Sequence, residues 1–177
     1  MTTFLKRGAP FVFICLLMAC SCGRSPLSVY GPAFETIMRS DTGLFRGMNM
    51  HLSKESIKAL EPGGLKEDDS TGGTDYLFYE LKIDTTISYT LAYYCPDNKL
   101  NNIAADIYLL NEPQAAELFN SFKSWFEKKY GVPQTDGDFF LWTIQTSEGK
   151  IRIELADESP TYKKGKITLV IRDAKEL

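Results

Sequence analysis

The sequence predicts an α+β fold in which helices pack on one face of antiparallel sheets. Two observations predict it: six segments alternate apolar and polar residues with a period of two, and two segments carry helix signals, one through its N-cap, hydrophobic staple and stop and the other through apolar residues at helical spacing. In sequence order, one helix is followed by three strands, and this order occurs twice. We therefore expect a single domain over 44–177, built of tandem α-β-β-β units at 44–110 and 111–177.

The first unit opens with a short helix. Ser53 is a natural N-cap, Leu52 and Ile57 are spaced as a hydrophobic staple, and Pro62-Gly63-Gly64 ends the helix. Three strands follow, and their apolar residues all carry odd numbers: Leu77, Tyr79, Leu81 and Ile83; Ile87, Tyr89, Leu91 and Tyr93; Ile103, Ala105, Ile107 and Leu109. Pairing Ile83 with Ile87 across a three-residue loop keeps this whole set on one face.

The second unit repeats the pattern with a longer helix. Asn111 is the cap candidate, Pro113 lies in the first turn, and Gly131 with Pro133 gives the stop. The strands after it present Phe140, Trp142 and Ile144; Ile151, Ile153 and Leu155; Ile167, Leu169 and Ile171. Arg152, Glu154, Lys166 and Arg172 are expected on the opposite, wet face.

The N-terminal 19 residues read as an export signal. Lys6 and Arg7 precede an apolar run from Ala9 to Met18, which is too short for a bilayer-spanning helix of about 20 residues. The run ends in Leu17-Met18-Ala19-Cys20, which resembles the lipobox of bacterial lipoproteins. The resemblance implies lipidation of Cys20, which would then become the mature N-terminus. Cys22 is a weaker alternative anchor, and ordinary cleavage with release is the other alternative.

A flexible tether is expected over 20–43, because Ser21-Cys22-Gly23-Arg24 is small and polar. No acidic cluster follows Cys20, as it does in some surface-exported lipoproteins, and Ser21 is not the aspartate that favours inner-membrane retention in enteric ones. By that resemblance we expect an outer-membrane anchor that faces the periplasm.

The body, over about residues 44–173, resembles small duplicated α-β-β-β envelope proteins, among them β-lactamase-inhibitor-like domains and outer-membrane assembly lipoproteins. Its Lys128-Lys129-Tyr130-Gly131-Val132-Pro133 phrase, ahead of a strand with Trp142, is similar to uncharacterised lipoproteins of Bacteroides-like bacteria. The resemblance implies no functional residue.

The charge balance argues against a nucleic-acid partner. The chain has 20 basic and 23 acidic residues, and removal of residues 1–19 takes two bases, so the formal charge falls from -3 to -5. Proteins that bind phosphate backbones cluster Lys and Arg on a basic surface. Here Lys163, Lys164 and Lys166 flank a glycine, as in a solvated turn.

Catalytic, metal and cofactor sites are not indicated by any motif. The one histidine, His51, has no oriented nucleophile near it in sequence, and we expect a partly exposed structural residue. The acidic segment 66–75 lacks the ligand spacing of a calcium loop, and a solvated turn is expected there. We expect no bound cofactor and no metal.

After processing, Cys22 and Cys95 remain in a compartment where disulfides persist. They are a candidate disulfide, and a buried free thiol at Cys95 is the alternative.

A surface is the remaining candidate site. Tyr76, Phe78, Tyr94 and Tyr108 fall on the expected wet face of the first sheet, with the first three toward one end. Exposed aromatic patches mark contact sites. The alternative is that the N-terminal segment, with Tyr30, Phe34 and Phe45, covers them.

Three functions follow as expectations. The first is a non-enzymatic, membrane-anchored module that binds or assembles another envelope protein. The second is an inhibitor-like protein that blocks an envelope enzyme with segment 66–75, and the third is a glycan-acting hydrolase, which requires a deep pocket with perturbed carboxylates.

Overall fold

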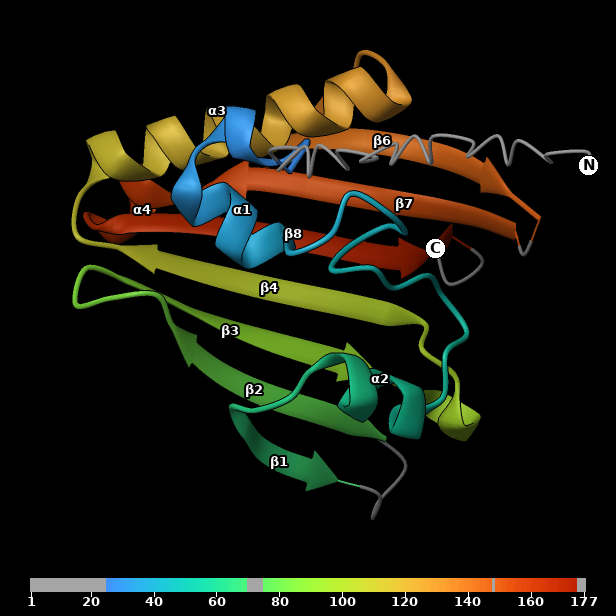
Figure 1. The fold of residues 1–177 in the computed structure, drawn as a ribbon. Helices are drawn as coiled ribbons and strands as arrows, with labels where there is room; N and C mark the ends of the chain where they lie inside the picture. The colour runs from blue at the N-terminus through green and yellow to red at the C-terminus, as the bar shows by residue number, and fades with distance from the viewer. Residues whose placement is uncertain (1–24, 70–74, 148, 175–177) are drawn as a thin grey trace, which may run out of the picture.

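The computed structural model describes residues 25–69, 75–147 and 149–174. Within these ranges the strands form one antiparallel sheet in the order β1-β2-β3-β4-β8-β7-β6-β5. Helices α1, α2 and α3 lie on the same side of it (Figure 1). The prediction of an α+β fold with helices on one face of an antiparallel sheet is confirmed.

The first half of the chain contains η1 (Ser28–Tyr30), α1 (Pro32–Met38), α2 (Lys54–Leu60), β1 (Leu65–Asp69), β2 (Tyr76–Lys82), β3 (Ile87–Tyr94), η2 (Pro96–Asn98) and β4 (Asn102–Leu109). The second half contains α3 (Glu112–Tyr130), β5 (Gln134–Asp136), β6 (Phe139–Thr146), β7 (Gly149–Asp157), α4 (Ser159–Tyr162) and β8 (Gly165–Asp173).

Each unit carries one more strand than the three predicted from the sequence. The extra strands, β1 and β5, lie at the two edges of the sheet, and their sequences, LKEDD and QTD, have no apolar alternation. Edge strands need only one partner, and charged residues on them discourage pairing with other chains. Each unit therefore contributes four strands in chain order from its edge of the sheet to the middle, where β4 of the first unit pairs with β8 of the second.

The caps and registers match the sequence prediction closely. The Ser53 hydroxyl accepts a hydrogen bond from the Ser56 N–H at 3.3 Å, and the Asn111 side chain accepts one from the Gln114 N–H at 3.1 Å. The Ile83 N–H donates to the Ile87 carbonyl at 3.0 Å, which closes the predicted three-residue loop.

The N-terminal segment corrects the expected tether. From residue 25 to 43 the chain is folded, and Leu27, Phe34, Ile37 and Met38 are among the most buried residues. The Phe34 ring lies 4.9 Å from that of Phe122 on α3. The tether prediction is wrong from Ser25 onward, because α1 supplies apolar surface that α3 alone leaves uncovered.

A buried ionic cluster fastens this segment to the sheet. Glu61, at the end of α2, accepts hydrogen bonds from Arg46 Nε at 2.5 Å, from Arg39 at 2.9 Å and from the Tyr93 hydroxyl at 2.7 Å. Arg46 also donates to the Ile37 carbonyl at 2.5 Å. Burial opposes the charge on Arg46, but the hydrogen bonds and charge of Glu61 outweigh it and raise the pKa of Arg46.

Candidate functional site

The candidate site is the sheet face opposite the helices, which we call the open face. It is formed by the even-numbered residues of β2, β3, β4, β7 and β8 and by the odd-numbered residues of β6, as the registers require. The odd-numbered residues of the central strands are buried under the helices. Among the described residues, the N-terminal segment and α1 to α3 all pack on that helical side (Figure 1).

The alternative that Tyr30, Phe34 and Phe45 cover the aromatic patch is therefore wrong. Phe34 and Phe45 are fully buried in the core on the helical side, and Tyr30 packs edge-on against Trp125 of α3, with ring centroids 5.5 Å apart. The three rings belong to η1, α1 and the loop after α1. Arg46 in that loop donates to the Ile37 carbonyl of α1 and pairs with Glu61 at the end of α2, which keeps this segment on the helical side. The open face remains uncovered by them.

Three of the four predicted aromatics gather at one end of the open face. Tyr76 and Tyr94 are register partners with ring centroids 6.1 Å apart, and Phe78 follows on the same side of β2. The Tyr76 hydroxyl donates to Glu67 at 2.6 Å, and this bond raises the pKa of Tyr76 to about 12. We call Tyr76, Phe78 and Tyr94 the aromatic cluster.

Tyr108 does not belong to this cluster. Tyr94 pairs with Asn102, and Tyr108 lies six residues farther along β4, roughly 20 Å away at about 3.3 Å per residue. It is 42% exposed and pairs with Ser88 and Lys166. Tyr108 lines a hollow of about 430 Å³ together with Glu80, Lys82 and Thr90.

A low apolar strip crosses the middle of the open face. The registers connect Phe78 to Ala92, Ala92 to Ala104, and Ala104 to Val170. Two alanines and a valine leave this strip shallower than the aromatic cluster beside it. The open face thus combines bulky rings at one end with a small apolar floor beside them.

The part of the open face contributed by the second unit carries a network of ion pairs. Glu154 accepts from Arg172 at 2.5 Å and lies 2.8 Å from Arg152, so two guanidinium groups share one carboxylate. Lys166 pairs with Glu158 at 2.7 Å and with Asp106 at 3.4 Å. The predicted placement of these residues opposite the core is confirmed.

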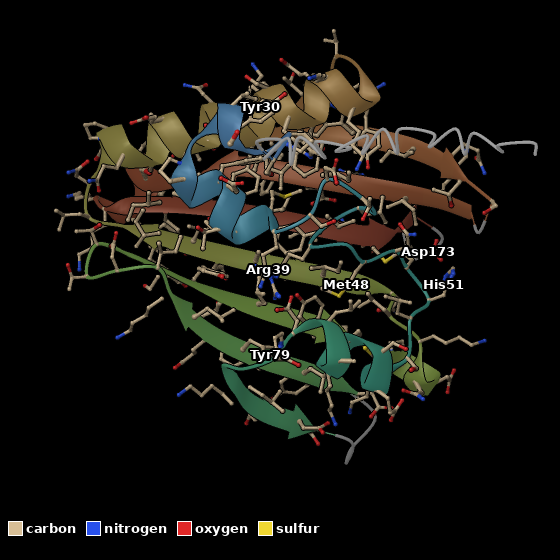
Figure 2. The ribbon with its side chains drawn as sticks, in the orientation of Figure 1. Tyr30, Arg39, Met48, His51, Tyr79 and Asp173 are labelled. Atoms are coloured by element: carbon tan, nitrogen blue, oxygen red, sulfur yellow. The ribbon has the colours of Figure 1, made fainter. Side chains whose placement is uncertain are left out.

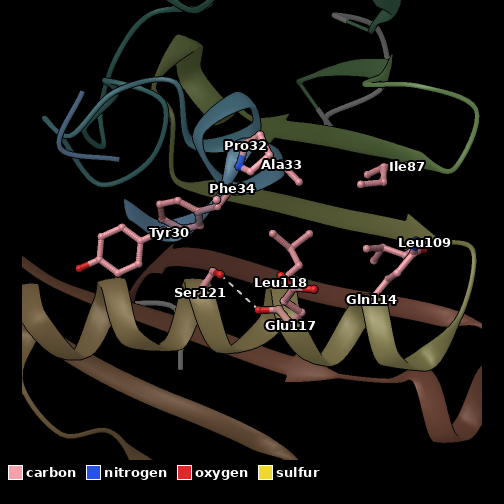
Figure 3. A pocket seen from close by; sticks show the side chains of 11 residues that line it. Tyr30, Pro32, Ala33, Phe34, Ile87, Leu109, Gln114, Glu117, Leu118 and Ser121 are labelled. Atoms are coloured by element: carbon pink, nitrogen blue, oxygen red, sulfur yellow. Dashed lines mark hydrogen bonds between the residues drawn. The ribbon is translucent and has the colours of Figure 1, made fainter. Parts of the chain in front are cut away.

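A second hollow lies on the helical side. It encloses about 200 Å³ between α1, α3 and the ends of β3 and β4, and its walls are mostly apolar, with Tyr30, Phe34, Ile87 and Leu118 among them (Figure 3). Among the described residues that line it, the one carboxylate is that of Glu117. It does not bring together the perturbed carboxylates that the hydrolase alternative requires.

Segment 66–75, which the inhibitor alternative takes as a blocking loop, begins with a strand. Glu67, Asp68 and Asp69 lie in β1, and residues 70–74 fall outside the described ranges. Asp68 and Asp75 both contact the buried Lys54, at 2.8 and 3.5 Å. The hydrogen bond from Lys54 lowers the pKa of Asp68. These two carboxylates therefore neutralise a buried lysine of the same chain.

His51 lies ahead of α2, with its Nε2 3.5 Å from Asp173, and the two are neighbours in Figure 2. Its side chain is 32% exposed, as expected for a partly exposed structural residue. Within the described ranges, no group of three or more His, Cys, Asp or Glu side chains is placed to hold a metal ion.

Cys95 has no disulfide partner among the described residues; its side chain is fully buried, and burial raises the pKa of its thiol to about 11. Its candidate disulfide partner Cys22, the candidate lipidation site Cys20 and the whole export signal lie outside the described residues. Lipidation and disulfide formation remain predictions. Within the described part of the chain, no helix is long and apolar enough to cross a membrane.

Sequence reasoning overlooked two features of the site and its support. The Arg46–Glu61 pair was not predicted, although an arginine between Phe45 and Met48 is a signal of a buried cation. The clustering of Arg152 and Arg172 on one carboxylate depends on the β7–β8 register, which the sequence alternation alone does not set. No protein-family profile, curated protein or solved structure matches this chain.

Proposed function

We propose that this chain is a lipid-anchored protein of the bacterial cell envelope that binds another protein through the open face of its sheet. The observation that carries the binding part is the uncovered aromatic cluster beside the Ala92–Ala104 floor. Aromatic and arginine side chains are the types that contribute most to protein interfaces, and the open face presents both.

The membrane part of the proposal rests on the Leu17-Met18-Ala19-Cys20 sequence. A lipoprotein-type cysteine carries several acyl chains, and two or more such signals anchor a protein stably. Only four residues, 21–24, separate Cys20 from the folded segment that starts at Ser25, and the five Cα-to-Cα steps from Cys20 to Ser25 span at most about 18 Å. The proposed anchor therefore holds the domain close to the bilayer, at the outer membrane and facing the periplasm.

The membrane part is tested by metabolic labelling with an alkyne fatty acid. The unmodified chain is expected to carry label and to sediment with membranes, whereas Cys20→Ala is expected to lose both. Cys22→Ala is the matched control and should keep them. A labelled Cys20→Ala chain, or an unlabelled soluble wild-type chain, would refute anchoring at this sulfur.

The binding part is tested by chemical crosslinking in intact cells followed by mass spectrometry. Tyr76→Ala combined with Phe78→Ala is expected to abolish the main crosslinked species, because it removes two of the three rings of the aromatic cluster. The matched control is Val29→Ala combined with Leu60→Ala, which removes two apolar side chains, 77% and 41% exposed, from η1 and α2 on the helical side. Unchanged crosslinking by the double variant would remove the open face as the binding surface.

A further inference from the structure

The hollow on the helical side has the size and walls of a small-molecule site. It encloses about 200 Å³ between α1, α3 and the ends of β3 and β4 (Figure 3). Its apolar walls are formed by Tyr30, Ala33, Phe34, Ile87, Leu109 and Leu118. An apolar cavity of about 150 Å³ holds a molecule as large as benzene. This hollow therefore has room for one ring, or a short alkyl chain, that bears a polar group.

Helix α3 adds a polar strip to these apolar walls. Gln114, Glu117 and Ser121 all line the hollow, and their spacing of three and four residues places them on one face of the helix. Gln114 and Tyr30 lie at opposite ends of the hollow in Figure 3, with Glu117 and Ser121 between them along α3. An apolar hollow with a few convergent polar groups is the usual form of a ligand site.

The side chain of Gln114 carries an unsatisfied acceptor. Gln114 is the third residue of α3, a position from which a glutamine often reaches back to the N–H of the cap residue. Here its Oε1 atom is buried, and no donor within the described ranges bonds to it. A buried acceptor without a donor is costly, and native structures supply the donor from bound water or a ligand. Because Gln114 lines the hollow, a molecule inside it can supply that donor.

The neighbouring polar groups also present acceptors. The Ser121 hydroxyl donates to the Glu117 carbonyl at 3.2 Å, so its oxygen is left as an acceptor toward the hollow. The Glu117 carboxylate is the one charged group among the described residues that line the hollow. The polar strip is therefore complementary to a positively charged group with several N–H donors.

We propose that this hollow binds a small primary amine, an alkyl or arylalkyl ammonium ion. The ammonium group has three donors and lies between Gln114 Oε1 and the Glu117 carboxylate, which come from neighbouring positions on α3. The apolar body packs against Ala33, Phe34 and Leu118. A carboxylate ligand would meet the like charge of Glu117. The site lies on the opposite side of the sheet from the open face, so this inference is independent of the proposed function.

Three small probes of similar shape test the charge of the ligand. They are benzylamine, which is protonated at neutral pH, its uncharged analogue benzyl alcohol, and the anion benzoate. Binding is measured by isothermal titration calorimetry of the full-length chain in lipid nanodiscs, with empty nanodiscs as the reference. Benzylamine is expected to bind with a Kd of about 1 mM or tighter. Benzyl alcohol should bind about fivefold more weakly, because an ion pair at a partly exposed site adds little more, and benzoate should not bind.

Variants of α3 test which groups hold the ammonium ion. Glu117→Gln is expected to weaken benzylamine binding about fivefold and to leave benzyl alcohol unchanged. Its matched control is Glu112→Gln, which removes the same charge from the same helix outside the hollow and should change neither. Gln114→Met should weaken both probes, since both donate a hydrogen bond. Glu117 is exposed, so its substitution keeps the fold.

A variant of α1 tests whether the hollow is the site. Ala33→Leu fills the hollow and is expected to abolish binding of benzylamine and benzyl alcohol, whereas Ala116→Leu, on the exposed surface of α3, should leave both unchanged. Urea unfolding shows whether each variant is folded. The inference is overturned if benzylamine does not bind, if benzyl alcohol or benzoate binds as tightly, if Glu117→Gln binds benzylamine like the unmodified chain, or if a folded Ala33→Leu chain still binds it.

Discussion

Removal of the Glu61 carboxylate tests how the N-terminal segment is held on the sheet. Glu61 is 3% exposed and Arg46 is 5% exposed, and Arg46 makes bonds of 2.5 and 2.8 Å to the two carboxylate oxygens. Glu61→Ala would leave the guanidinium group buried without its counter-charge. Breaking a buried pair in this way costs about 3–5 kcal/mol, and the Tyr93 hydroxyl also loses its acceptor.

The assay is urea unfolding of the purified protein, followed by the fluorescence of Trp125 and Trp142, which are both buried. Glu61→Ala is expected to lower the free energy of unfolding by about 3–5 kcal/mol. Glu80→Ala, which removes an exposed carboxylate from the sheet, is expected to change it by less than about 0.5 kcal/mol. A loss below about 1 kcal/mol in Glu61→Ala would refute the idea that this cluster holds α1 and α2 to β3.

Three further predictions concern the segments that the structure redefines. Phe34→Ala should lower the free energy of unfolding by about 3–5 kcal/mol in the same urea assay, because the ring is fully buried, while Val29→Ala should be nearly neutral. Equal and small losses in both variants would support the flexible tether instead. Cys95, with its pKa raised to about 11, should react with an aromatic disulfide reagent at pH 8 only after unfolding, in a chain with Cys22→Ala; rapid labelling of the native chain would contradict its burial. The contribution of Asp68 should be complete above its ordinary pKa of 3.8 and be lost as the pH falls through the lowered value, so the destabilisation that Asp68→Asn causes at pH 6 should shrink as the pH is lowered below 3.8; a difference independent of pH would exclude the ion pair with Lys54.

Much of the fold could be predicted because the sheet buries one face. Alternation such as Leu77, Tyr79 and Leu81 sets which side each strand turns to the core, and the caps Ser53 and Asn111 set where two helices begin. The edge strands β1 and β5 could not be predicted in this way, since they are mostly exposed and bury no apolar row.

The N-terminal segment escaped prediction because α1 is only seven residues long and the chain ahead of it begins with small and polar residues. Its apolar residues Phe34, Ile37 and Met38 occur at helical spacing but over a length too short to form a stable helix alone. The segment is held by the packing of Phe34 on α3 and by Arg46, which donates to the Ile37 carbonyl and pairs with Glu61. The contacts with α3 and Glu61 join residues that lie far apart in the sequence.

The candidate site was predicted in part. The alternation placed Tyr76, Phe78 and Tyr94 together, and the registers confirm that arrangement. It did not separate Tyr108 by its position along β4, and it did not predict that Arg152 and Arg172 share Glu154, because both depend on how neighbouring strands are aligned.

Photo-crosslinking from the open face in living cells tests the central claim most directly. A benzophenone side chain at Thr90, in the middle of this face, is expected to capture a discrete protein species, and the same group at Ser124, on the exposed surface of α3, is expected to capture none. Capture from Ser124 with none from Thr90 would contradict the claim that this protein binds through the sheet face opposite its helices.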